Sequence, residues 1–184
     1  NATSENQLRQ TDIAQPAIGA VSLAMIKILK RFGITPDVTC GHSFGELSAL
    51  YSAGWMDEAA FLKLSAARGK HMAHASLQDG DTGSMLAVKA PLEKIRSLIH
   101  DEKLDLVLAN ENSPDQGVLS GPTHQIDAAK KICRKHGMTA VKLPVAAAFH
   151  SRFVETAAIP FQEDLTQISF SPTAIPVLSN TTGK

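Results

Sequence analysis

The sequence predicts an α/β protein in which a small unit of strands and helices is inserted into a larger one. Apolar residues recur at helical spacing in some segments and form short continuous runs, typical of strands, in others. A Gly-x-Ser-x-Gly turn at residues 41–45 joins one such run to a helical pattern. Residues 84–145 then follow the order β-α-β-β-α-β, which is the ferredoxin-like arrangement.

The composition is that of a globular chain and argues against several function classes. The 184 residues are 43% hydrophobic, enough for one sizeable core or a core with a small satellite. Lys and Arg together number 18, as do Asp and Glu together, so the formal net charge is zero. The sequence has no basic stripe that would indicate a nucleic-acid partner. Two cysteines are too few for a disulfide scaffold, so we expect a reducing, cytoplasmic setting. We find no secretory signal and no apolar run of membrane-spanning length, and expect no membrane partner.

The individual elements are predicted from apolar spacing and turn residues. Residues 1–12 are polar and predict a frayed end, and residues 38–40 predict a buried strand. Helices are predicted at 14–31, from the serine turn to about 53, at 57–75 with Asp57 as its cap, at 91–100, 123–136 and 151–166, and strands at 84–88, 106–110, 117–120, 139–145 and 176–179. We assign residues 1–83 and 146–184 to a discontinuous large subdomain and residues 84–145 to the small one.

The turn around Ser43 predicts a nucleophile. A serine at a sharp strand-to-helix turn is exposed, and we expect both flanking glycines, Gly41 and Gly45, to be required because side chains there would clash. Its oxygen would lie at a helix N-terminus, where free N–H groups and the helix dipole favour negative charge. This arrangement suits attack on a carbonyl group. The same pattern also arises by chance as an ordinary tight turn. Residues elsewhere in the chain are therefore needed to distinguish a nucleophile from such a turn.

A serine nucleophile needs a base, and the chain has seven histidines. His150 follows an apolar run where the chain leaves the small unit, so it could return over the main sheet. Successive side chains in a sharp turn point different ways, so we expect His42 to line the pocket or orient the turn. His71 and His74 have a spacing that would allow a metal pair, but no third ligand accompanies them. We therefore expect these two, like the three histidines at helix ends, to be ordinary surface residues.

Six short segments together resemble the malonyl-CoA:acyl-carrier-protein transacylases and the acyltransferase domains of polyketide and polyunsaturated fatty acid synthases. The segments are Ala14–Ala17, Gly33–Asp37, Gly41–Glu46, Ala67–Gly69, Val118–Gly121 and Ala147–Ser151. They span most of the chain in the family's order, which makes them far more specific than the serine turn alone. The resemblance implies an α/β-hydrolase-like large subdomain with a ferredoxin-like small subdomain inserted, and the order of strands and helices in residues 84–145 independently predicts the same insertion.

The resemblance also assigns roles to residues of this chain. Ser43 matches the nucleophile that becomes acylated, and His150 matches its general base. Arg68 matches the arginine that holds the free carboxylate of a malonyl group, for which a planar guanidinium is suited by its bidentate hydrogen bonds. The backbone N–H of Phe44 is expected to donate to the oxyanion, and Gln15 is placed among the substrate-binding residues.

Phe149 bears on the choice of substrate. In the resembled family, a bulky phenylalanine before the catalytic histidine accompanies malonyl use, because it crowds the position of an α-methyl branch. This chain departs from the common pattern at Ala147, where malonyl-specific modular domains often have histidine. Malonyl remains the predicted acyl group, and a packing-only role for Phe149 is the alternative.

The resemblance implies a transacylase that moves malonyl from malonyl-CoA, through a serine ester, to the phosphopantetheine thiol of an acyl carrier protein. It implies no metal or redox cofactor in the domain, and neighbouring domains of a multidomain synthase as further partners. Two alternatives stay open: a serine hydrolase or editing thioesterase, which has no need of Arg68, and a non-catalytic docking domain. The family's Gly-Gln-Gly-type loop does not precede Gln15, and its final segment is not reached at Lys184. We therefore expect an incomplete piece of the domain, with poor turnover by itself.

Overall fold

A computed structural model describes residues 2–76 and 80–184. The chain divides into two compact units, unit 1 formed by Asn1–His71 and Ile159–Lys184 and unit 2 by Met72–Ala158. These boundaries differ from the assignment of residues 84–145 to the small subdomain. The last turn of the helix Glu58–Ala75 and the segment 146–158 also belong to unit 2. They contact the sheet of this unit and each other.

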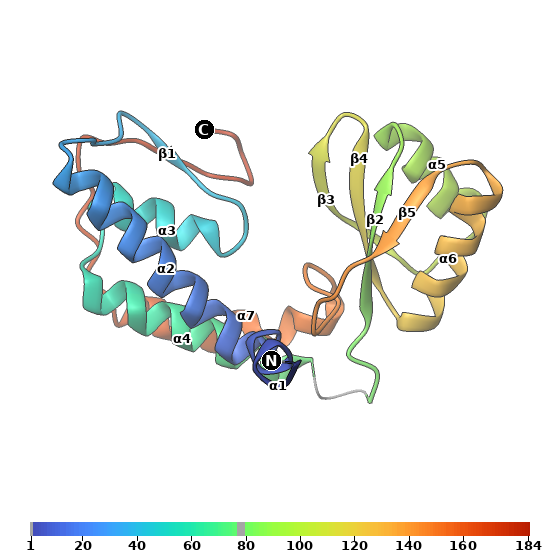
Figure 1. The fold of residues 1–184 in the computed structure, drawn as a ribbon, viewed down its shortest axis with the longest axis horizontal. Coiled ribbons are helices and arrows are strands. Elements are labelled where there is room, and N and C mark those ends of the chain that lie inside the picture. Colours follow the sequence, from blue (N-terminus) through green and yellow to red (C-terminus); the bar gives the residue numbers. More distant parts are fainter. Residues whose placement is uncertain (1, 77–79) are drawn as a thin grey trace. The chain divides into compact units, whose positions relative to one another are not determined.

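Unit 1 is mainly helical (Figure 1). Its elements are α1 (Ala2–Leu8), α2 (Thr11–Arg31), β1 (Thr39–Cys40), α3 (Gly45–Ser52), α4 (Glu58–Ala75), α7 (Ala158–Thr166) and β6 (Val177–Leu178), where α4 and α7 cross the unit boundary. The strands β1 and β6 pair in parallel. Asp57 caps α4 as predicted, since its Oδ1 accepts a hydrogen bond from the N–H of Ala60 at 2.7 Å. Two predictions were wrong: residues 2–8 are helical, and the strand at 38–40 is exposed except for Thr39.

The core of unit 1 forms where α2, α3 and α4 meet. Its buried side chains are Leu23, Phe44, Leu47, Met56, Phe61 and Leu64. Two glycines let α2 and α4 approach closely. A β-carbon at Gly19 would lie 2.8 Å from Ser65 Oγ, and one at Gly69 would lie 2.8 Å from the carbonyl oxygen of Thr11. This close packing brings the side chains of the two helices together near the start of α2.

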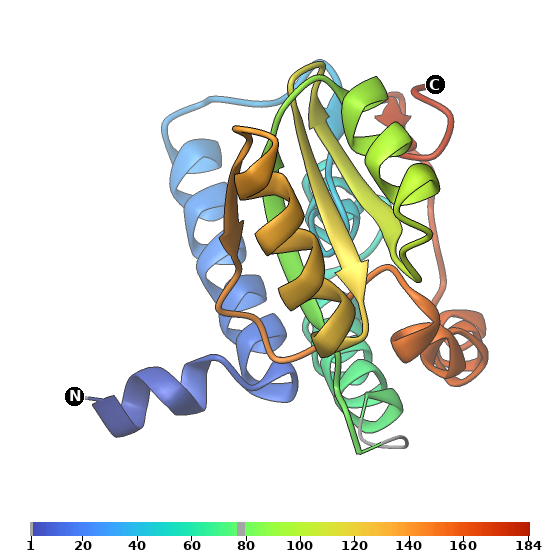
Figure 2. The same ribbon diagram turned by 90° about the vertical axis from the view of Figure 1, so that its right-hand side faces the viewer.

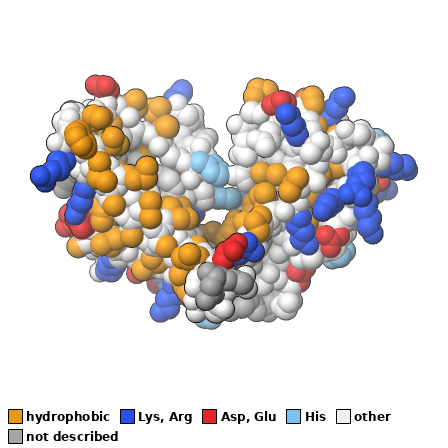
Figure 3. All heavy atoms as spheres, viewed as in Figure 1, with side chains coloured by type: hydrophobic (Ala, Val, Ile, Leu, Met, Phe, Trp, Pro, Cys, Tyr) orange, Lys and Arg blue, Asp and Glu red, His pale blue; other side chains and the backbone are white. Residues whose placement is uncertain are grey.

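The outer face of α2 is apolar and exposed. Its large side chains Ile18, Val21, Met25 and Ile28 are each more than half exposed, as is Phe32 just after the helix, and hydrophobic side chains gather over this part of unit 1 (Figure 3). By length and composition α2 could cross a membrane, which contradicts the expectation that no apolar run has that length. A core helix of a soluble protein meets the same criterion when it is mostly buried, whereas 17% of the apolar window of α2 is buried, and its buried side chains include the polar ones of Thr11 and Gln15.

Unit 2 confirms the predicted βαββαβ order. Its elements are β2 (Ser84–Lys89), α5 (Leu92–Asp101), β3 (Val107–Ser113), β4 (Gln116–Gly121), α6 (Thr123–Lys135), β5 (Thr139–Lys142) and a 3-10 helix η1 (Arg152–Ala157). The antiparallel sheet has the order β3-β4-β2-β5, and α5 and α6 cover one face of it (Figure 2). The core lies between these layers and includes Leu86, Leu119 and Ile126. The predicted strand at 139–145 ends earlier, and the predicted helix at 151–166 begins as η1.

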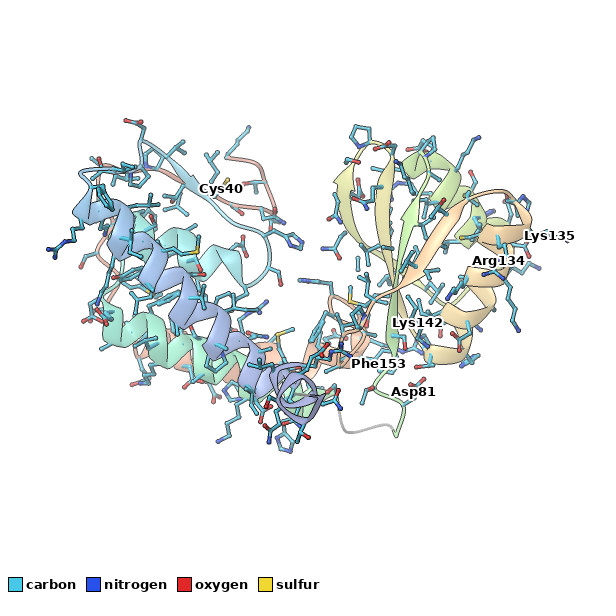
Figure 4. All side chains as sticks on the ribbon, in the orientation of Figure 1. Cys40, Asp81, Arg134, Lys135, Lys142 and Phe153 are labelled. Carbon is cyan, nitrogen blue, oxygen red and sulfur yellow. The ribbon has the colours of Figure 1, made fainter. Side chains whose placement is uncertain are left out.

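Asp81, labelled in Figure 4, lies on the segment that leads into β2. Its carboxylate accepts hydrogen bonds from the backbone N–H and the hydroxyl of Thr123, at 2.9 and 2.7 Å, and from the N–H of Gly83 at 2.9 Å. Thr123 begins α6, whose own N-cap position is Pro122 and supplies no side-chain bond. Asp81 therefore caps a helix that lies far along the chain, and it holds the entry of β2 beside that helix.

Candidate active site

The turn at Ser43 has the geometry that a nucleophile requires. Ser43 has a φ of 55°, in the left-handed region that residues other than glycine rarely adopt. A β-carbon at Gly41 would lie 2.0 Å from the carbonyl oxygen of Gly45 and 2.6 Å from the nitrogen of Glu46, so only glycine fits there. Apart from its chain neighbours and the backbone of its own helix, no described atom lies within 4 Å of a β-carbon built on Gly45. The prediction that both glycines are sterically required is therefore right for Gly41 and wrong for Gly45.

The elements on either side hold this turn in place. The hydroxyl of Thr39 on β1 donates to the carbonyl oxygen of Ala49 on α3 at 3.1 Å, which ties the strand to the helix that follows the turn. The side chain of Phe44 is 8% exposed and packs in the core of unit 1 against Phe61. Any contact of Phe44 with a substrate is therefore confined to its backbone. His42 is exposed.

Arg68 on α4 contacts both Ser43 and Gln15. Its Nη2 donates to Ser43 Oγ at 3.2 Å, and its Nη1 donates to Gln15 Oε1 at 2.9 Å. Gln15 is 7% exposed on α2, and the missing side chain of Gly69 allows α4 to lie against that helix. Three residues that are distant in sequence therefore form one hydrogen-bonded group inside unit 1.

The charge of Arg68 has only neutral hydrogen-bond partners among the residues that the structure describes. Burial lowers the pKa of its guanidinium, and the charge of Glu46 opposes this effect, but an arginine stays protonated in proteins. In the described ranges 2–76 and 80–184, no carboxylate oxygen lies within 4 Å of the guanidinium nitrogens. A partly buried cation without a close counter-ion favours the binding of an anion. The arrangement can therefore hold an anionic group next to a serine hydroxyl.

His150 and Phe149 lie in unit 2, on the loop between β5 and η1. His150 is exposed and has a φ of 58°, again in the left-handed region. Phe149 packs against a small cluster formed by Met72, Ala75 and Ala157. This contact is compatible with the packing-only alternative for Phe149, and its role in substrate choice stays a prediction.

Sequence reasoning missed two polar contacts in unit 1. His71 was expected on a solvated face, but its Nε2 lies 2.7 Å from Asp164 Oδ2, which links α4 to α7. Glu46 received no role, yet its Oε1 accepts from the N–H of Asn180 at 3.1 Å and ties the chain end to the first turn of α3. Within the described part of the chain, no three His, Cys, Asp or Glu side chains are grouped to hold a metal ion. A hollow of about 650 Å³ between α2 and β1–α3 is lined by neither Ser43 nor Arg68, so we do not assign it to an acyl group.

Known proteins match this chain over nearly all of its length. A malonyl CoA-acyl carrier protein transacylase of Synechocystis sp. is 36% identical over 178 residues, which are 96% of this chain and 58% of that protein. A highly reducing polyketide synthase of Leptosphaeria maculans is 36% identical over 89% of this chain and 6% of its own length. This chain therefore spans about three fifths of the separate transacylase and a small part of the synthase.

Solved structures of the same kinds of protein superpose on this chain. The malonyl CoA-acyl carrier protein transacylase from Burkholderia pseudomallei superposes with a TM-score of 0.86 at 34% identity, covering 97% of this chain and 61% of that one. The acyltransferase domain of an iterative polyketide synthase in enediyne biosynthesis superposes with a TM-score of 0.84 at 35% identity, covering 94% and 45%. The acyl transferase domain family matches residues 1–184. With the serine turn, the arginine contact and the inserted βαββαβ unit in place, the chain belongs to the acyl transferase domain family.

Proposed function

We propose that the protein transfers a malonyl group from malonyl-CoA to the phosphopantetheine thiol of an acyl carrier protein. The observation that carries this proposal is the contact between Arg68 and Ser43. Ser43 Oγ lies 3.2 Å from a cation that has no carboxylate partner among the described residues, which suits an acyl group with a free carboxylate at its far end. Malonyl, a three-carbon diacid, has this chemistry.

In the first half of the reaction, Ser43 Oγ attacks the thioester carbonyl and passes its proton to the imidazole of His150. The carbon–sulfur bond then breaks, and coenzyme A leaves with that proton as a free thiol. The N–H of Phe44 donates to the developing oxyanion. The product is a malonyl ester on Ser43, with its free carboxylate held by Arg68.

In the second half, His150 takes the proton of the phosphopantetheine thiol. The sulfur attacks the ester carbonyl, and the proton returns to Ser43 as the ester bond breaks. Fixing the malonyl carboxylate orients the ester toward one incoming nucleophile, which favours the thiol over water. No step needs a metal or redox cofactor. We further propose that the protein works in fatty acid or polyketide synthesis, next to other domains of a synthase. The similarity to a polyketide synthase supports these neighbouring domains. The proposed setting is the cytoplasm.

The test is acylation of the full-length protein by malonyl-CoA, read by intact mass and peptide mapping. A mass increase of one malonyl group on Ser43, absent in Ser43→Ala and transferred on addition of a carrier protein, is the expected result. A hydrolase would release free malonate instead of accumulating the ester, and a docking domain would form no adduct. Either outcome would refute the proposed transfer.

A further inference from the structure

The loop that carries His150 is fastened to the sheet of unit 2 by hydrogen bonds that the mechanism above does not use. Ser120 on β4 has no exposed surface, and its Oγ donates to the carbonyl oxygen of Phe149 at 2.7 Å. The N–H of Ala148 donates to the carbonyl oxygen of Thr82, just ahead of β2, at 2.9 Å. Both bonds fall on the two residues that precede His150.

A second hydroxyl closes the turn at His150 itself. Ser151 Oγ donates to the carbonyl oxygen of Ala148 at 2.5 Å, and it accepts from the N–H of Phe153 at 3.4 Å as the N-cap of η1. His150, with a φ of 58°, lies between these bonds. A left-handed conformation costs a residue with a β-carbon of the order of 1 kcal/mol and persists only where the surroundings impose it.

The packing of this loop leaves it little room to shift. A β-carbon at Gly83 would lie 2.5 Å from the β-carbon of Ala148 and 2.8 Å from the carbonyl oxygen of Gly121. The same β-carbon would lie 3.4 Å from the ring of Phe153, which Figure 4 labels at the start of η1. The loop is therefore pressed against the ends of β2 and β4, and the bond from Ser120 determines the orientation of the peptide before His150.

We propose that Ser120 is a positioning residue for His150. Its buried hydroxyl fixes the peptide between Phe149 and His150, and in this way it holds the imidazole in the orientation that its role as base requires. The inference rests on the function proposed above, in which His150 is the base. Displacing a catalytic group by 1 Å costs about 100-fold in rate, and losing one of the several bonds that hold this loop should cost less, about tenfold.

The experiment compares Ser120→Ala with Ser120→Thr, which keeps the hydroxyl, and with Ser84→Ala as a matched control. Ser84 is a buried serine on the neighbouring strand, and its Oγ lies 3.0 Å from Thr123 Oγ1 rather than on the His150 loop. In the full-length protein, Ser120→Ala should lower kcat for malonyl transfer about tenfold and leave the KM for malonyl-CoA within about twofold. Ser120→Thr should recover most of this loss, and Ser84→Ala should match the unaltered protein. Equal kcat values for Ser120→Ala and Ser84→Ala would overturn the proposal.

A double-mutant cycle separates positioning from general support of the fold. In a His150→Ala background, Ser120→Ala should cause no further loss of the residual rate, because the group that it positions is gone. The same loss in both backgrounds would contradict the proposal. If circular dichroism shows that Ser120→Ala does not fold, Ser120→Cys carries the same cycle, since a thiol is a weaker donor of similar shape. A normal rate for His150→Ala would instead refute the proposed function, so the two failures are distinguishable.

Discussion

Arg68 Nη2 lies 3.2 Å from Ser43 Oγ, so the residue predicted to hold the substrate carboxylate donates directly to the residue predicted to form the ester. Arg68 also donates from Nη1 to Gln15 Oε1 at 2.9 Å, and this second hydrogen bond fixes the plane of the guanidinium group. Two consequences can be tested. The cation should select acyl groups with a free carboxylate, and a new negative charge at Gln15 should interfere with that selection.

Replacing the cation should remove the preference for a diacid. We expect Arg68→Ala to slow Ser43 acylation by malonyl-CoA about 100-fold, because two charge-assisted hydrogen bonds contribute about 3 kcal/mol together. Acylation by acetyl-CoA, which has no second carboxylate, should change far less. Stopped-time mass spectrometry of the ester measures both rates, with the exposed Arg31→Ala as a control. An unchanged ratio of malonyl to acetyl loading would argue against the assignment.

Gln15→Glu should raise the KM for malonyl-CoA about tenfold. The new carboxylate would form an ion pair with Arg68 and compete with the carboxylate of the substrate for the same guanidinium. Gln10→Glu, at an exposed position just before α2, is the matched control for added charge. Steady-state kinetics at two salt concentrations give the comparison. A KM that rises equally in both variants would mean that general charge repulsion is responsible.

The two glycines of the serine turn should differ in their tolerance of alanine. Gly41→Ala places a β-carbon 2.0 Å from the carbonyl oxygen of Gly45, so it should lower the free energy of unfolding by more than about 3 kcal/mol or prevent folding. The β-carbon of Gly45→Ala would meet no described atom within 4 Å beyond its chain neighbours and its own helix, and it lies at the start of α3, where alanine favours the helix. Urea unfolding of the two variants measures the difference. Equal destabilisation would show that the turn rearranges around Gly41.

The small unit was predictable because the helical spacing and the short apolar runs that mark its helices and strands are local to each element. The contact between Arg68 and Ser43 was expected only from the family resemblance, because no pattern within α4 or the serine turn shows by itself that the two side chains meet. The strand at 38–40 was misjudged for a related reason. An apolar run indicates a strand but not which of its side chains other elements cover, and here Val38 is 50% exposed. Likewise, the N-cap of α6 comes from Asp81, beyond the range of any local pattern.

The cap formed by Asp81 should make the stability of unit 2 depend on pH. Hydrogen bonds, foremost that from the side chain of Thr123, lower the pKa of Asp81 against the opposing effect of desolvation. In the unfolded chain an aspartate has its ordinary pKa of about 3.9, so the stabilisation that the ionised carboxylate provides is fully present above that pH. It is lost as the pH falls through the lower pKa of the folded state, where the carboxylate takes up a proton.

Asp81→Asn keeps one acceptor oxygen and replaces the other with an amide group that cannot accept, so it should reduce the free energy of unfolding by about 1 kcal/mol at pH 7, the size of one lost hydrogen bond, and by less near pH 3. Urea titrations at both pH values measure this difference, and Asp101→Asn, an exposed carboxylate at the end of α5, is the control. A loss of equal size at both pH values would mean that the asparagine is sterically unsuitable. The ionised carboxylate would then not be what stabilises the junction of β2 and α6.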